Sequence, residues 1–435
     1  MSSLKIAYVG AGSAEFAARL IGDFVSIPGI EGGTFALVDV DAERLGLARR
    51  VSEKIVQASG KDWAVVASTE RQEVLADSNY VINSIEVAGL ACVDFDYRIP
   101  LKFGVDQCVG DTIGPGGIFK ALRTGPAWLG IVDDVQRLAP GALILNYTNP
   151  MSILTLAADR SSQVPVVGLC HSVQGTSKQL AGYLGLPYEE LEWKCAGINH
   201  NAWFTVLRHD GADMYPRLRE RAREPRIYEQ DPVRFETMLH LGAFVTESSG
   251  HFSEYVPYFR KRPDLVARYA RGGYRGESGF YARNWPRWRE AKLQPLREML
   301  GGEVPVQLGR THEYASYIVE AIELDRPIEI YGNVTNKGLI DNLLAGNVEV
   351  ACRVDREGVH PLPFGPLPEQ LAALNRAHMS VHELVVEALV ERDRDKARLA
   401  LMLDPLTAAV CSLEEISRLF DEMWAAERAY LKAFE

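Results

Sequence analysis

Residues 4–25, LKIAYVGAGSAEFAARLIGDFV, decide the fold that the sequence predicts. An apolar run ends in a glycine turn and is followed by apolar residues at helical spacing, which predicts a buried strand, a tight turn and a helix. Glycine lets the backbone of such a turn approach a pyrophosphate, and the N-terminus of the following helix favours its negative charge. Gly10, Gly12 and Ser13 are therefore candidate dinucleotide-binding residues, with a purely structural glycine turn as the alternative.

The alternation of strand and helix continues through the first third of the chain. Short runs rich in Val, Ile and Leu alternate with helix-like stretches, which predicts a Rossmann-like, doubly wound α/β fold with a parallel sheet covered on both faces. Asp39 closes the second predicted strand, where a carboxylate accepts hydrogen bonds from an adenosine ribose and favours NAD over NADP. Asn83, in a later strand, is a further candidate for the same crevice, and a hydrogen-bonded core amide is the alternative.

The pattern changes near Pro150. The segment ELEWKCAGINHNAWFTVLRHDG predicts antiparallel strands that close with an Asp-Gly turn, and the C-terminal residues predict amphipathic helices. We therefore expect an NAD-binding domain over residues 1–150. A second α+β lobe over residues 151–435, which carries the metal-binding and catalytic residues, is expected to pack tightly against it.

Composition narrows the function to that of a small-molecule enzyme. The 435 residues include 47 Lys and Arg against 58 Asp and Glu, a formal net charge of -11, which argues against nucleic acid and anionic membranes as partners. The 6 cysteines show no CxxC pairing, as expected for free thiols in a reducing compartment. With no signal-peptide pattern and no run of about 18 apolar residues, we expect a cytoplasmic protein.

Polar residues follow several of the predicted strands. Asp111 opens the second glycine-rich loop, DTIGPGG, where a loop carboxylate can lie beside a ligand. Asn146 and Asn149 lie at and just beyond the end of the strand ALILNY, at the edge where amides can hold sugar hydroxyls. A plain connector is the alternative for the loop, and turn chemistry before Pro150 is the alternative for Asn149.

Two further segments contain candidate metal ligands and bases. Cys170 and His200 follow separate strand-like segments, and they could converge on one divalent metal, although each alone is more typical of a buried core residue. His251 and Tyr255 are four residues apart, so on a helix they would share a face. Either is a candidate general base, and aromatic packing is the alternative.

Taken together, these motifs resemble glycoside hydrolase family 4, and the resemblance runs in order through most of the chain. CHSVQGT and GINH are most similar to the corresponding segments of melibiase-type α-galactosidases. His171 stands where members that act on 6-phosphorylated sugars have Asn or Asp, which argues against a phosphorylated substrate. The motifs that carry the resemblance are GAGSAEF, GDTIGPGGIFKALRT, LNYTNPMSI, GLCHSVQGT, CAGINHNAW, FVTESSGHFSEY and YGNVTNKGLIDNL.

The resemblance implies a glycosidase that depends on NAD+ and on a divalent metal, with Mn2+ as the expected ion. In such a reaction C3 of the sugar is oxidised, C2 is deprotonated, the glycosidic oxygen leaves, water adds, and C3 is reduced again. By resemblance, Cys170 and His200 are the metal ligands and His171 is the general acid.

The resemblance leaves the base open. The C2 proton passes to Tyr255 or His251, with help from Asp111, and Asn149 binds sugar hydroxyls. Tyr255 has the chemistry of the family's tyrosine base, whereas His251 is the better positional match.

The leading hypothesis is therefore an α-galactosidase that acts on small oligosaccharides such as melibiose. The same reaction on α-glucosides or α-galacturonides is an alternative, because an arginine from residues 259–290 could hold a uronate carboxylate. An NAD-dependent hydroxy-acid dehydrogenase and a non-catalytic NAD sensor are alternatives of other classes. The family resemblance predicts a homodimer or a homotetramer.

Overall fold

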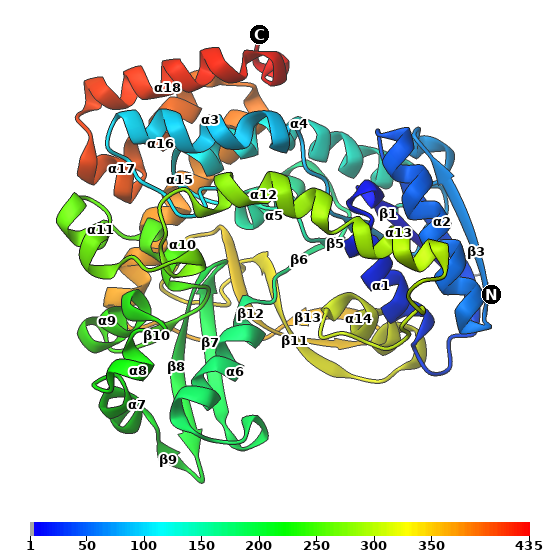
Figure 1. Cartoon of the computed structure of the whole chain (residues 1–435), viewed down its shortest axis with the longest axis horizontal. Helices are drawn as coiled ribbons and strands as arrows, with labels where there is room; N and C mark the ends of the chain where they lie inside the picture. Colours follow the sequence, from blue (N-terminus) through cyan, green and yellow to red (C-terminus); the bar gives the residue numbers. More distant parts are fainter. Residues whose placement is uncertain (1–3) are drawn as a thin grey trace.

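The computed structural model describes residues 4–435, and its first six strands form a parallel sheet (Figure 1). Their spatial order is β3-β2-β1-β4-β5-β6, which is the strand order of dinucleotide-binding domains. The predicted Rossmann-like fold is thus confirmed. The strands are β1 (Lys5–Val9), β2 (Gly32–Val38), β3 (Asp62–Ser68), β4 (Tyr80–Asn83), β5 (Leu143–Asn146) and β6 (Val166–Leu169).

Side chains that alternate along the strands enter separate cores on the two faces of this sheet. Ile6 and Tyr8 of β1 share a core with Phe24, whereas Ala7 and Val9 share another core with Trp128. Both faces of the parallel sheet are therefore covered by helices, as the Val/Ile/Leu-rich strands predict. The helices between the strands are α1 (Glu15–Val25), α2 (Ala42–Ser59), α3 (Gly89–Lys102), α4 (Gly114–Leu138) and α5 (Met151–Ser161).

The sheet continues without a break into the second half of the chain. Beyond β6, the order is β11-β12-β7-β8-β10, all antiparallel. Strands β7 and β8 form the predicted antiparallel pair, and the predicted Asp210-Gly211 turn joins β8 to β9. One sheet thus spans both predicted domains, and their boundary near residue 150 stays a prediction. The added strands are β7 (Glu192–Ile198), β8 (Asn201–His209), β9 (Ala212–Asp213), β10 (Phe244–Val245), β11 (Ile328–Thr335), β12 (Asn347–Asp355) and β13 (Gly358–Pro361).

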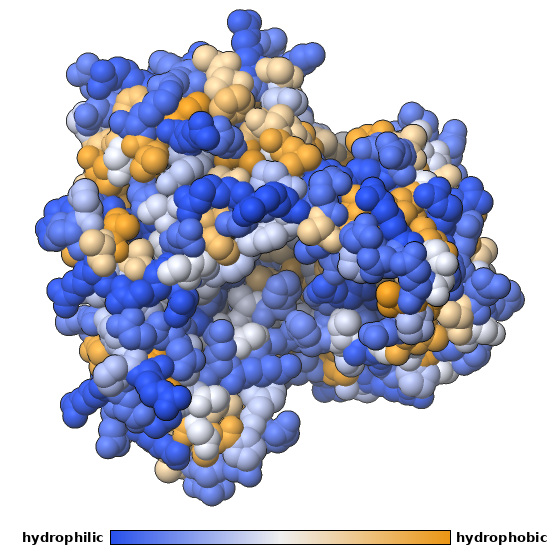
Figure 2. All heavy atoms as spheres, viewed as in Figure 1, coloured by the Kyte–Doolittle hydropathy of each residue, from blue (hydrophilic) through white to orange (hydrophobic). Residues whose placement is uncertain are grey.

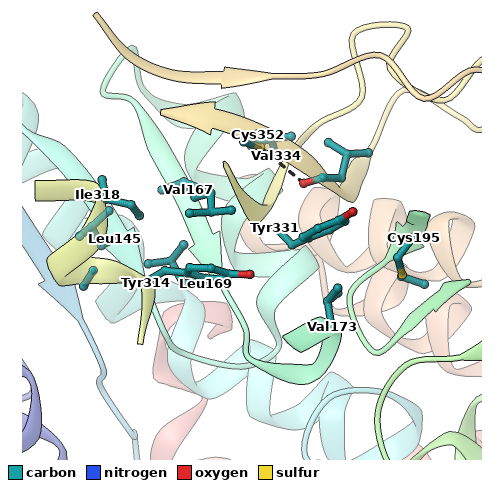
Figure 3. Close-up of a cluster of buried hydrophobic side chains, with 14 of the residues drawn as sticks. Leu145, Val167, Leu169, Val173, Cys195, Tyr314, Ile318, Tyr331, Val334 and Cys352 are labelled. Carbon is teal, nitrogen blue, oxygen red and sulfur yellow. Dashed lines mark hydrogen bonds between the residues drawn. The ribbon is translucent and has the colours of Figure 1, made fainter. Parts of the chain in front are cut away.

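A shared apolar core joins the parallel and antiparallel parts of the sheet (Figure 3). Leu145 and Val167, from the parallel strands, belong to the same buried cluster as Tyr331 and Cys352 from the antiparallel strands. Helix α14 (Tyr314–Leu324) contributes Ile318 to this cluster. The continuous core accounts for the tight packing of the two parts.

Helices cover the remaining surfaces of the sheet. Helix α6 (Ser172–Leu184) follows β6, and the predicted C-terminal helices are confirmed. The helices between β9 and β11 are α7 (Tyr215–Arg221), α8 (Pro225–Tyr228), α9 (Pro232–Leu241), α10 (Ser249–Tyr255), α11 (Pro263–Tyr269), α12 (Phe280–Ala291) and α13 (Gln294–Gly301), followed by α14. The C-terminal helices are α15 (Glu369–Glu391), α16 (Arg394–Leu403), α17 (Pro405–Val410) and α18 (Leu413–Glu427).

A buried ion network joins the last long helix to α3 and α4, which lie between strands of the parallel sheet. Helix α18 lies against α3 and α16 (Figure 1). Arg123 of α4 donates two hydrogen bonds to Asp96 of α3, at 2.9 and 2.8 Å, and a further one to Glu427 of α18. All three side chains are buried, so the guanidinium is the charge that compensates the carboxyl groups.

The visible surface is mostly hydrophilic, and apolar side chains gather over the C-terminal helices and α3 (Figure 2). Leu90 and Leu101 of α3, Leu399 and Leu403 of α16, and Leu413 are all exposed there. Apolar clusters of this kind are typical of subunit contacts, and the homo-oligomer stays a prediction. Within residues 4–435, no helix is long and apolar enough to cross a membrane.

Arg123→Met is expected to lower the free energy of unfolding by about 3–5 kcal/mol, because it leaves buried Asp96 without its cation. Urea unfolding of the purified protein measures the change. Arg98→Met is the matched control, since Arg98 pairs with Asp94 on the exposed face of α3 and should matter much less. Equal changes for the two variants would contradict a stabilising role for the buried network.

Candidate active site

The predicted site residues meet at the C-terminal edge of the parallel strands. Gly10 follows β1, Asn146 ends β5, and Cys170 follows β6. His200 lies in the turn between β7 and β8, and helix α10 brings His251 next to it. Residues from both halves of the chain thus form one site, at the edge where ligands bind in open α/β sheets.

The first glycine turn forms a cradle that only glycine fits. Gly10 has a φ of 90°, and a Cβ there would lie 2.7 Å from the backbone of Ser84. A Cβ on Gly12 would lie 2.5 Å from the Asp39 carboxylate, which accepts a hydrogen bond from the Gly12 N–H at 2.7 Å. The buried Ser13 hydroxyl has no hydrogen-bond partner among residues 4–435. This turn fits a dinucleotide, with close backbone approach at the end of β1 and a carboxylate at the end of β2.

The asparagines near the crevice are buried to different degrees. Asn83 and Asn146 have no exposed surface, and Asn83 Nδ2 donates to Asn146 Oδ1 at 2.8 Å and to Thr148 at 3.1 Å. These bonds favour the core-amide alternative for Asn83, and direct ligand contact of either residue stays a prediction. The buried Oδ1 atoms of Asn83 and Asn149 both lack a partner within the described part of the chain, and Asn149 makes no other side-chain hydrogen bond there that would mark it as a core amide.

Cys170 and His200 are brought together as candidate metal ligands. The Cys170 Sγ and His200 Nε2 atoms lie 3.3 Å apart. Thiolate and imidazole ligands of one ion, at bond lengths of about 2.3 and 2.1 Å, are separated by about 3.1–3.6 Å, so the pair fits a divalent metal. His200 is buried and has a φ of 60°, a conformation that non-glycine residues adopt mainly at functional sites.

Helix α10 places His251 and Tyr255 on one face, as predicted, with ring centroids 5.5 Å apart. His251 Nε2 shares a hydrogen bond with His200 Nδ1 at 3.0 Å, and its Nδ1 lies 3.6 Å from Glu254. Both ring nitrogens of His251 therefore face protein groups. The buried Tyr255 hydroxyl has no such partner among the described residues, so its position leaves it available to a substrate.

Asp111 lies in a small charged cavity that also contains a lysine. Lys120 Nζ, on the second turn of α4, lies 3.4 Å from Asp111 and 3.1 Å from Glu86. These groups line a cavity of about 20 Å³ that Tyr281 and Trp285 of α12 also border. Lys120 and Glu86 were missed by the sequence analysis, although Lys120 belongs to the motif that begins at Gly110.

The lysine determines the protonation of Asp111. Burial raises the pKa of this carboxyl group, but the charges of Lys120 and His251 outweigh burial, and its pKa falls to about 2. Asp111 is therefore ionised at neutral pH. Burial similarly opposes the charge of Lys120, whose pKa is nevertheless raised to about 12 by Glu86 and Asp111.

His171 stands at the open side of the site with a carboxylate beside it. Its Nδ1 lies 3.7 Å from Glu313 Oε1, and the interaction with this buried carboxylate raises the pKa of His171. The His171 side chain is 62% exposed, so solvent screens the pair. Glu313 precedes α14, 142 positions away in the sequence, and no motif marked it.

Two more carboxyl groups border the candidate metal ligands. Glu247 Oε1 lies 3.9 Å from His200 Nε2, and Glu247 has a positive φ of 74°. Burial raises the pKa of Glu247, but the neighbouring His200 and His251 lower it to about 2. Burial also raises the pKa of Glu349, whose Oε1 accepts a hydrogen bond from Asn333. Neither residue was singled out from the sequence.

Four of the eight arginines of residues 259–290 pair with protein carboxylates. Arg260 is buried and binds Asp106, and Arg271 binds Glu229. Arg283 likewise binds Glu277. These arginines are compensated, whereas Arg268, Arg275, Arg287 and Arg289 have no carboxylate partner among the described residues, so a uronate site in this segment stays a prediction.

A wide groove lies at the opposite edge of the sheet. Its volume is about 820 Å³, and its walls include Asn79, Gly141 and Pro165, which precede β4, β5 and β6. None of the candidate catalytic or metal-binding residues lines this groove. The chemistry-bearing side chains therefore lie in the narrower space at the carboxyl ends of the strands.

Two family descriptions match most of the chain. Residues 5–186 match the family 4 glycosyl hydrolase model, and residues 195–407 match the C-terminal domain of the same family. The α-galactosidase of Bacillus subtilis (strain 168) is 38% identical, over 99% of this chain and 100% of that protein. The α-galactosidase of Rhizobium meliloti (strain 1021) is also 38% identical, over 100% and 90%.

A solved structure supports the fold over the whole length. A 6-phospho-α-glucosidase from gut microorganisms, in complex with NAD and Mn2+, superimposes with a TM-score of 0.81 over 99% of each chain. Sequence identity to it is 21%, so this likeness concerns the fold alone.

Lys120→Met is expected to raise the pKa of Asp111 by about 1–3 pH units, because burial then acts without the nearest opposing cation. In the wild type, Asp111 takes up a proton only when the pH falls to its low pKa. In Lys120→Met it would take up the proton at a higher pH. Carbon-13 NMR of aspartate-labelled protein measures this titration, with Asp111→Asn to assign the signal. Lys102→Met, which removes an exposed lysine of α3, is the control. An unchanged Asp111 titration in Lys120→Met would contradict this electrostatic account.

Proposed function

The chain belongs to family 4 of the glycosyl hydrolases, and on this premise we propose that it is an NAD+- and Mn2+-dependent α-galactosidase. The proposal includes oxidation at C3 of the sugar, proton removal at C2, loss of the glycosidic oxygen, addition of water and reduction at C3. The two α-galactosidases that are 38% identical over nearly the whole chain support the sugar preference.

One observation carries the proposal: the candidate metal ligands, the candidate base and the glycine cradle lie at one edge of the sheet. The 3.3 Å approach of Cys170 and His200 supports a shared ion, and the Gly10–Gly12 turn supports the dinucleotide. When bound, NAD+ accepts and returns a hydride, and Mn2+ supplies Lewis acidity toward the sugar oxygens. In this proposal Gly10, Gly12, Ser13 and Asp39 hold the dinucleotide.

The structure supports Tyr255 as the proposed base and His251 as a positioning residue. His251 Nε2 shares its hydrogen bond with His200 Nδ1, and His251 Nδ1 lies 3.6 Å from Glu254, which supports a positioning role for this ring. Burial and nearby carboxylates raise the pKa of Tyr255, so the hydroxyl holds its proton until a ligand changes the local charge. In this proposal Asp111, which is ionised at neutral pH, accepts a hydrogen bond from the substrate.

At the open side, His171 is the proposed acid. A proton on its imidazole is stabilised by Glu313 and can be given to the departing glycosidic oxygen. Solvent exposure of this side chain fits a group that must reach a leaving sugar of variable size. Asn149 is proposed to bind a sugar hydroxyl through its free Oδ1.

The uronate alternative receives less support from the charges of the site. Arg260, Arg271 and Arg283 are bound to carboxylates of the protein, so a uronate would need one of the arginines of residues 259–290 that has no such partner. Neutral galactosides need only hydroxyl-binding groups such as Asn149. A hydroxy-acid dehydrogenase would release NADH, whereas the proposed enzyme uses its cofactor without net oxidation.

A panel of p-nitrophenyl glycosides tests the proposal. We expect hydrolysis of the α-galactoside in the presence of NAD+, Mn2+ and a reductant, less of the α-glucoside and α-galacturonide, and no hydrolysis when NAD+ or Mn2+ is left out. Hydrolysis that survives removal of all three additives would contradict the redox mechanism. Faster hydrolysis of the α-galacturonide would contradict the sugar assignment.

Cys170→Ser is expected to weaken Mn2+ binding by at least about 10-fold, because an alcohol replaces a thiolate ligand. Electron paramagnetic resonance of free Mn2+ measures the affinity without reference to activity. Cys411→Ser is the matched control, since Cys411 is a partly buried thiol that bonds to Phe103 O near α17. Equal Mn2+ affinities for wild type and Cys170→Ser would contradict the assignment of this ligand.

A further inference from the structure

Residues 106–110 lead into the Asp111 loop. They are hydrogen-bonded to residues 250–281, which are far away in the sequence. Arg260 donates to the Asp106 carbonyl at 3.0 Å and to its carboxylate at 2.7 Å. The carbonyl of Gln107 accepts from Gly279 N–H at 2.7 Å, and that of Cys108 accepts from Tyr281 N–H at 3.0 Å. The 250–281 segment therefore holds this loop in place through its main chain.

One carboxylate supplies the complementary set of acceptors. Glu254 accepts hydrogen bonds from the consecutive backbone N–H groups of Cys108, Val109 and Gly110, at 2.5, 2.6 and 3.0 Å. Glu254 is 1% exposed, so its charge is compensated by these dipoles and not by water. Successive N–H groups that converge on one anion form a concave binding site that is both strong and directional.

The same carboxylate belongs to helix α10, which carries the proposed base. Glu254 Oε2 lies 3.6 Å from His251 Nδ1, and His251 in turn bonds to His200. Tyr255 is the next residue along α10. Glu254 is thus the point at which the Asp111 loop, the α10 helix and the His200 turn are held together.

We propose that Glu254 is a positioning residue that sets Asp111 against Tyr255 and His251. This inference rests on the proposed function, in which those groups act on one sugar. Glu254 itself touches neither proposed ligand, because its oxygens are taken up by the loop and by His251. Glu254 acts on the relative positions of the groups that contact the sugar. A displacement of such a group by about 1 Å can lower the rate about 100-fold.

Glu254→Gln is the decisive variant, because it keeps the size of the side chain and replaces one acceptor oxygen with an N–H2 donor. That donor would face backbone N–H groups, which are also donors, or His251. The lost hydrogen bonds force the loop to move. We expect kcat on p-nitrophenyl α-galactoside to fall by about 10- to 100-fold, with KM changed by less than about 3-fold. Both constants are measured on folded protein, well below the unfolding temperature.

Glu415→Gln is the matched control. Glu415 also accepts a backbone N–H, from Ser412 at 2.8 Å, but it caps α18 in the C-terminal region. We expect its kcat to equal that of the wild type. If Glu254→Gln does not fold, Glu254→Asp provides the same test, since a side chain shorter by one methylene cannot reach the loop and His251 together.

A purely structural role predicts a different outcome. Glu254 would then affect the unfolding temperature, while the folded fraction of the variant would keep the wild-type kcat. That result would overturn the proposal. If the wild type hydrolyses none of the glycosides, the proposed function fails, and hydrogen exchange at residues 108–110 decides the inference: protection equal in wild type and Glu254→Gln would overturn it.

Discussion

The site depends on the constraint that parallel strands end at the same edge of a sheet. This brings the glycine turn after β1, the asparagines after β5 and Cys170 after β6 to one crevice, although they are far apart in sequence. The antiparallel strands extend the same sheet from β6, so the β7–β8 turn delivers His200 within 3.3 Å of Cys170. Neither half of the chain holds a complete site.

Much of the fold was predictable, because its signals are local. The apolar runs of β1 to β6 and the glycine turn define the doubly wound sheet, and the four-residue spacing of His251 and Tyr255 placed both on one helical face. The continuation of the sheet through β11, β12 and β7 could not be predicted in this way. It arises from pairings between distant strands, for which a single sequence carries no signal.

The distinction between local signals and contacts of distant segments also applies to the candidate site. Cys170, His200 and Asp111 belong to motifs. Glu254 also lies in one, but its partner is more than 140 positions away, as is the partner of Glu313, which no motif contains. The choice between His251 and Tyr255 also required the structure, since it depends on the hydrogen bond that occupies His251 Nε2. Four carboxyl groups lie in this region: Glu254 and Glu349 are buried, Asp111 and Glu247 are partly buried, and Lys120 lies 3.4 Å from Asp111.

The central claim is that the proposed active site removes a proton from C2 of the sugar during hydrolysis of a glycoside. Hydrolysis of an α-galactoside in D2O, followed by NMR of the released sugar, tests it most directly. Because water returns the proton to the deprotonated carbon, the account predicts deuterium at C2 of the product galactose. Product that carries only hydrogen at C2 would contradict the account, since direct displacement at C1 leaves that bond untouched.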